Sequence, residues 1–121
     1  MGGNEGYEVV YYETASGRSP VREFIAALPV KAQVKCDYYV SRLQERGTLP
    51  RQYAAHLAGD IWELRPEYAN VEYRLFYGRL GRRFIMVHAM TKKRSAVPRR
   101  DIELAQRRFE EAKKHYAMED A

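Results

Sequence analysis

Three short apolar segments, separated by connections of hairpin length, constrain the fold of this chain more than any other feature. They are DIWELR (60–65), VEYRLFY (71–77) and RRFIMVHAMT (82–91), joined by PEYAN and GRLG. β-branched and aromatic residues are typical of strands, and connections this short join antiparallel neighbours. The sequence therefore predicts a three-stranded antiparallel meander.

The part of the chain before the meander predicts one strand and two helices. Aromatic and β-branched residues at 7–13 indicate the strand. Ser19 followed by Pro20 is a typical N-cap and first-turn pair, so a short helix is expected from there to about Pro29. A longer helix follows and ends at Gly47, and TLPRQYAAHLAGD after it is read as a loop with one helical turn.

A last helix is expected at 98–116, where apolar residues form one stripe. The element order β-α-α-β-β-β-α predicts an α+β fold with an antiparallel or mixed sheet of about four strands. The length of 121 residues fits a single domain, 1–121. We expect flexible ends at 1–6 and 117–121.

Positive charge is concentrated in the second half of the chain. The formal net charge is +5, and residues 65–108 hold twelve Lys or Arg against four Asp or Glu. A local basic excess is typical of proteins that bind nucleic acid, although solvated helix faces give a weaker version of it. The charge pattern therefore favours a polyanionic partner.

Several other classes of protein are disfavoured. No segment approaches the roughly 18 consecutive apolar residues of a membrane span, and no signal-peptide pattern opens the chain, so we expect a cytoplasmic protein with no membrane partner. Cys36 is the one cysteine and reads as a packed thiol. Metal-ligand spacings and nucleotide-binding glycine loops do not occur, so we expect no metal and no cofactor.

Strand alternation sorts the meander into two faces, because successive side chains point to opposite sides of a sheet. Trp62 and Leu64 share one face and are expected in the core. Arg65 lies on the other face, together with Arg74 and Phe76, and this face is expected to be open. Two cations of one face therefore lie beside an aromatic ring.

Two lysines, Lys92 and Lys93, follow the last strand of the meander and are expected at the rim of the open face. Cations hold phosphates, and Phe76 or Tyr68 offers a ring on which a base can stack, which is the composition of a single-stranded RNA site. A single arginine on a solvated strand more often serves solubility. Four cations together favour a binding site.

A family resemblance covers roughly residues 57–108. IWELRPEYANVEYRLFY, followed by a strand and helix that read HAMTKKRSAVPRRDIELAQRR, resembles the HigB-like toxins of the RelE/ParE superfamily, especially their phage-associated branch. The similarity lies in four ordered elements: a W-E-L-R strand, a Y-R strand, a lysine pair, and a helix that follows a proline and has an I-x-x-A-x-x-R pattern. The resemblance implies a RelE-like fold.

The resemblance also implies a function. It is that of the toxin of a type II toxin–antitoxin system, a metal-independent endoribonuclease that cleaves mRNA on the ribosome, inhibits translation and is neutralised by a cognate antitoxin, often a helix-turn-helix protein. Matched position by position, its catalytic cations are Arg65, Arg74, Lys92 and Lys93. Further groups expected to hold the substrate are Arg94, Arg99, Arg100 and Phe76. The helix dipole disfavours cations in a first turn, which favours a binding role for the last two arginines.

The general base is not evident from these motifs. RelE has lysines in the strand that matches DIWELR, where this chain has Ile61 and Glu63. Attack by a ribose 2′-OH needs a proton acceptor, and the candidate acids or bases are Glu63 and His88. A lysine among crowded cations loses its proton more readily, so Lys92 or Lys93 is a further candidate for the proton donor or base. Glu63 could instead pair with Arg65, and His88 could be a half-buried packing residue.

Other interpretations remain open at this point. A non-catalytic RelE/ParE-like protein would act by binding, as a gyrase-type inhibitor or as a nucleic-acid-binding module. An inactive phage-derived copy would retain the fold without the reaction. Tyr38 and Tyr39 of the second helix could belong to an antitoxin interface or to the core.

Overall fold

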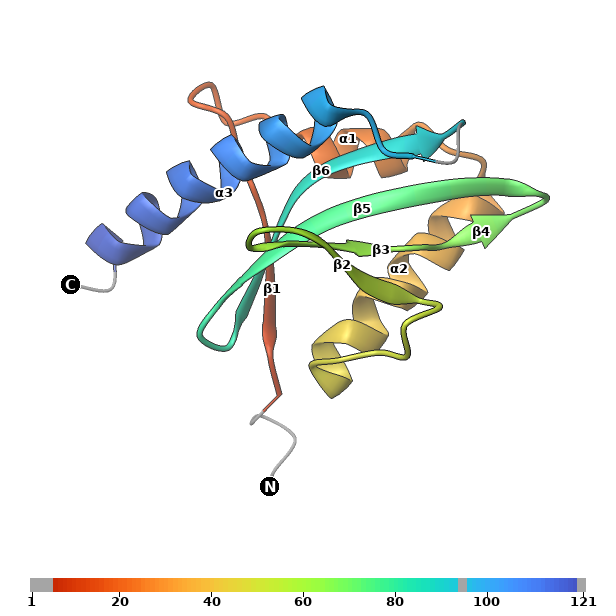
Figure 1. Ribbon diagram of the computed structural model, residues 1–121, viewed down its shortest axis with the longest axis horizontal. Coiled ribbons are helices and arrows are strands. Elements are labelled where there is room, and N and C mark those ends of the chain that lie inside the picture. The colour runs from red at the N-terminus through yellow and green to blue at the C-terminus, as the bar shows by residue number, and fades with distance from the viewer. Residues whose placement is uncertain (1–5, 94–95, 120–121) are drawn as a thin grey trace.

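A six-stranded sheet with helices on both faces forms the body of the protein (Figure 1). The computed structural model describes residues 6–93 and 96–119. The elements in chain order are β1 (Glu8–Tyr11), α1 (Pro20–Ala26), α2 (Val30–Arg46), β2 (Ala54–Ala58), β3 (Ile61–Leu64), β4 (Glu67–Tyr68), β5 (Val71–Leu80), β6 (Arg83–Lys92) and α3 (Arg99–Glu119). Both the α+β class and the helix order are confirmed.

The sheet is mixed. Its order is β1-β6-β5-β3-β2, with β4 paired to β5, and β1 runs parallel to β6 while the other pairs are antiparallel. The four expected strands are present, and two short ones are added, because the segment read as a loop contains β2 and the first connection of the meander contains β4. The alanine-rich β2 has weak strand propensity of its own, and pairing with β3 determines its conformation.

The helix ends follow the predicted signals closely. α1 begins at Pro20, and α2 ends at Gly47, whose φ of +82° is left-handed. A Cβ at Gly47 would also overlap the ring of Tyr7, which lies directly before β1, so the close approach of Tyr7 also favours glycine there. α3 continues to Glu119, three residues beyond the predicted end.

Two apolar clusters fill the space on either side of the sheet. Leu75 and Tyr77 belong to the cluster under α1 and α2, whereas Ile61 and Phe76 belong to the cluster under α3. The prediction of an open face at Phe76 was therefore wrong: Phe76 is fully buried and cannot stack on a base. Alternation assigned the correct face, but α3 covers that part of it.

Trp62 was also predicted wrongly. It is 42% exposed, although Leu64 on the same face is buried as expected. The Trp62 ring packs edge-on against His56 of the edge strand β2, at a centroid distance of 5.4 Å, rather than under a helix. A large apolar ring therefore lies on the surface of the α2 side.

A bulge in β6 changes which of its side chains face each side of the sheet. The register passes from Phe76 opposite His88 to Tyr77 opposite Met86, which leaves Val87 as the extra residue. Val87 and His88 consequently both face α3. Beyond the bulge, Met90 returns to the α3 side and Ala89 to the α2 side.

Gly78 allows α3 to lie close to the sheet. A Cβ at Gly78 would lie 2.5 Å from the ring of Phe109. Gly78→Ala is therefore expected to lower the free energy of unfolding by about 1–3 kcal/mol, as overpacking typically does. Urea denaturation measures this. Phe109→Leu should cost less in the Gly78→Ala background than in the parent, and a Gly78→Ala protein as stable as the parent would contradict the packing described.

Candidate functional site

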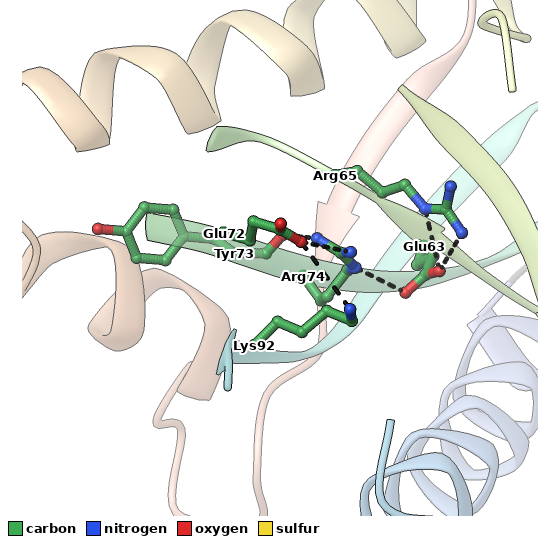
Figure 2. A network of polar contacts seen from close by, with 6 residues as sticks. All are labelled: Glu63, Arg65, Glu72, Tyr73, Arg74 and Lys92. Carbon is green, nitrogen blue, oxygen red and sulfur yellow. Dashed lines mark hydrogen bonds and ion pairs between the residues drawn. The ribbon is translucent and has the colours of Figure 1, made fainter. Parts of the chain in front are cut away.

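Five charged side chains form a continuous series of ion pairs across three neighbouring strands (Figure 2). From one end to the other they are Arg65, Glu63, Arg74, Glu72 and Lys92, and we call them the ion network. The N–O separations along this series are 3.0 Å, 3.2 Å, 3.0 Å and 3.9 Å. The structure thus brings together three of the four cations predicted to be catalytic.

Strand register explains the assembly. Glu63 of β3 lies opposite Phe76 of β5, and Glu72 lies opposite Lys92 of β6. Residues two apart share a face, so these side chains and Arg74 all lie on the α3 side of the sheet. The ion network therefore continues the α3 cluster along the same face.

Burial divides the ion network into an inner pair and an outer group. Glu63 and Arg74 are 4% and 6% exposed, respectively, so they form the inner pair. The side chains of Arg65 and Glu72 are 35% and 47% exposed, and that of Lys92 is 18% exposed. Arg65, Glu72 and Lys92, which we call the outer group, can contact a substrate without a rearrangement of the protein, whereas the inner pair cannot.

Arg74 is held on several sides. Its Nη2 donates to Glu72 Oε1 at 3.0 Å, and its Nη1 donates to the backbone carbonyl of Tyr73 at 3.0 Å. Its Nε lies 3.2 Å from Glu63 Oε1, but these two buried atoms are not aligned for a hydrogen bond. This contact is therefore charge pairing alone, and Arg74 anchors two carboxylates.

Charge in the ion network is largely compensated internally. Three cations face two carboxylates, and Lys93, directly after β6, is exposed. The 3.9 Å separation between Lys92 Nζ and Glu72 Oε1 is longer than a hydrogen bond. A phosphate could therefore draw Lys92 away from Glu72 more readily than it could displace a carboxylate from Arg74.

His88 contacts α3 instead of the ion network. Its Nε2 lies 2.7 Å from Asp101 Oδ1, and its ring stacks on Phe76 at a centroid distance of 5.5 Å. The His88 side chain is thus half-buried between β5 and α3. Burial lowers the pKa of His88 below its usual value, and the hydrogen bond to Asp101 opposes this only in part.

The lowered pKa of His88 predicts a pH dependence of stability. The unfolded chain takes up the His88 proton below about pH 6.5, whereas the folded protein resists it, so the free energy of unfolding should fall as the pH drops below that value. Urea denaturation at about pH 7.5 and about pH 5 measures this. His88→Gln keeps a polar partner for Asp101 but does not titrate, and it should flatten the difference. An equally steep difference in the variant would exclude His88 as its source.

The remaining predicted cations surround the junction between β6 and α3. Arg99 and Arg100 are exposed in the first turn of α3, and Arg99 Nε lies 3.2 Å from Glu103 Oε2. Arg94 lies outside the described residues. Tyr73, next to Arg74 in β5, is buried on the other face of the sheet, and its ring packs edge-on against Phe24.

Glu72 is the site residue that sequence reasoning missed. Glu72 lies two residues before Arg74 and so shares its face of the sheet, but the β5–β6 register is what brings it opposite Lys92. Its carboxylate then bridges Arg74 and Lys92. Spacing in the sequence does not reveal such a pair, because the register depends on the turn and on the bulge.

The described part of the chain offers neither a reactive cysteine nor a metal site. Cys36 is fully buried, and burial raises its pKa to about 11, so the packed thiol is confirmed. Residues 6–93 and 96–119 contain no group of three His, Cys, Asp or Glu side chains placed to hold a metal ion. Among the same residues, no helix has the length and apolar character needed to cross a membrane.

Comparison with known protein families gives one match. The family model described as "Phage derived protein Gp49-like (DUF891)" matches residues 23–110. Comparison with curated proteins gives no match. The matched segment is most of the chain, and it contains every member of the ion network. The chain therefore belongs to the Gp49-like family of phage-derived proteins.

Proposed function

We propose that this protein is the toxin of a type II toxin–antitoxin system, and that it cleaves mRNA on the ribosome as a metal-independent endoribonuclease. The observation that carries the proposal is the ion network, which gathers a cation directly after β3 and cations of β5 and β6 at the positions where the sequence resembles HigB-like toxins. Membership of a phage-derived family agrees with the phage-associated branch of that resemblance.

In the proposed reaction, the cations at the surface of the site have a different role from buried Arg74. The ribose 2′-oxygen attacks the adjacent phosphorus while the bond from phosphorus to the 5′-oxygen breaks, leaving a 2′,3′-cyclic phosphate and a 5′-hydroxyl. Arg65, Lys92 and Lys93 would hold the phosphate and stabilise its added negative charge. Buried Arg74 would act indirectly, by holding the Glu72 carboxylate in position.

Glu72 is our candidate for the proton acceptor. Of the two carboxylates in the ion network, Glu63 is buried between Arg65 and Arg74, whereas Glu72 is half-exposed beside Lys92. A general base must reach the proton it removes, and only Glu72 can reach a bound 2′-OH without unpacking. A lysine of the outer group would return a proton to the leaving 5′-oxygen.

A second candidate function is binding without cleavage. The specific observation in its favour is that Arg74, a cation expected to be catalytic, is already paired with two carboxylates and a backbone carbonyl. A protein of this kind would arrest growth and leave mRNA intact. The fate of the mRNA therefore separates the two proposals.

Growth and protein synthesis under controlled expression test the toxin proposal. Induction of the parent protein should stop both in the cytoplasm of a bacterial host. Co-expression of a helix-turn-helix protein encoded in the neighbouring reading frame, the proposed antitoxin, should restore them. Normal growth at a verified high level of folded protein would refute the toxin proposal.

A further inference from the structure

The exposed side of α2 and the segment after it enclose a groove of about 720 Å³. Three tyrosines and three cations account for most of its lining: Tyr38, Tyr39, Tyr53, Lys35, Arg42 and Arg46. Tyr39 and Tyr53 meet edge-to-face at a centroid distance of 5.7 Å, which gives one wall a fixed aromatic surface. Among the described residues that line the groove there is no carboxylate, although Arg42 Nη1 lies 3.0 Å from Glu45 at its margin.

An apolar stripe runs along α2 beside the groove. Val30, Val34 and Tyr38 are 72%, 63% and 57% exposed, respectively. Their spacing of four residues aligns them on one side of the helix. Three large apolar side chains in line on a solvent-exposed helix face are unusual for a surface with no partner.

A second hollow of about 480 Å³ adjoins the groove. The two share Leu49, and the second is lined by Trp62 and by Arg51. This is the exposed tryptophan that alternation predicted to be in the core. The stripe, the groove and the hollow thus form one surface on the α2 side of the sheet, while the ion network lies on the α3 side.

We propose that this surface docks an acidic, amphipathic helix of a partner protein. Aliphatic residues such as Val30 and Val34 offer nothing to a nucleic acid but pack well against the apolar face of a helix, with Tyr38 and Trp62 as anchors. The cations of the groove, including Lys35, select acidic residues on the partner. The inference does not depend on the proposed ribonuclease activity, and docking here would leave the ion network uncovered.

Selection from a displayed library of helical peptides, each roughly 18 residues long, tests the proposal on the full chain. The enriched peptides should combine acidic residues with apolar residues at spacings of three and four. Binding can be followed through Trp62, the one tryptophan in the chain. A single-stranded RNA oligonucleotide, added as a competitor, should not displace the peptides.

Matched variants locate the binding surface. Val34→Glu with Tyr38→Glu should weaken binding by at least roughly tenfold, whereas Met118→Glu, a change at an exposed apolar residue of α3, should leave it unchanged. Lys35→Glu with Arg46→Glu should also weaken binding, and peptides with Lys in place of Glu should restore it. The proposal would be overturned if the enriched peptides bound the α2 variants as tightly as the parent protein, or if the RNA displaced them.

Discussion

Replacement of both Lys92 and Lys93 by alanine is expected to lower mRNA cleavage by about 10³-fold and to abolish growth arrest. Removing one charge-stabilising group from an active site typically costs about 10²–10³ in rate, and this variant removes two. Among the described residues, the ion-pair partner of Lys92 is Glu72 at 3.9 Å, and Lys93 is exposed, so the fold should be retained. Circular dichroism and urea denaturation check that the variant is folded.

A control variant that loses two lysines elsewhere on the surface shows whether the effect depends on the positions of Lys92 and Lys93. Lys31→Ala with Lys114→Ala removes two exposed lysines from α2 and α3 and should leave arrest intact. Arg74→Ala is a poor probe by comparison, because Arg74 is buried and its loss would remove one of the two ion-pair partners of buried Glu63. If the Lys92 and Lys93 variant still arrested growth at equal expression, these lysines would not belong to the reaction site.

The second large effect is expected on stability. Glu63→Gln keeps the shape of the side chain but removes the charge that compensates buried Arg74 and half-buried Arg65. Breaking a buried ion pair from one side typically costs about 3–5 kcal/mol. That is a large share of the total of about 5–15 kcal/mol that stabilises an ordinary domain. Urea denaturation of the variant should therefore show a strongly lowered midpoint.

Glu72→Gln is the matched control for this change, because Glu72 pairs with the same Arg74 from the exposed side. Its loss should cost only about 1 kcal/mol or less, as is usual for exposed pairs. Cleavage should nevertheless fall by about 10²–10⁴, the usual contribution of a general base. A stable Glu63→Gln protein would contradict the inner pair, and a fully active Glu72→Gln protein would exclude Glu72 as the base.

Local sequence signals predicted most of the fold. Pro20 and Gly47 marked helix ends, and period-two alternation placed Arg65 and Arg74 on one face of the sheet. These features depend on neighbouring residues alone, so they can be read from the sequence.

The errors arose where distant segments meet. Alternation says which residues share a face but not which helix covers it, so Phe76 was expected on the surface and Trp62 in the core. In the same way, only the strand register and the bulge in β6 reveal that Glu72 faces Lys92 and that His88 faces α3. The candidate site was thus predicted as a set of cations with Glu63 beside Arg65, but without Glu72, whose carboxylate joins Arg74 to Lys92.

The central claim is that this protein cuts mRNA on the ribosome with Lys93 and the outer group of the ion network. Mapping of mRNA ends by primer extension, with purified protein and an mRNA that is either translated or free, tests it most directly. The account predicts cuts with 2′,3′-cyclic phosphate ends in the translated mRNA alone, and none with the Lys92 and Lys93 variant. Intact translated mRNA, at parent protein levels that arrest growth, would contradict the claim and favour a protein that acts by binding.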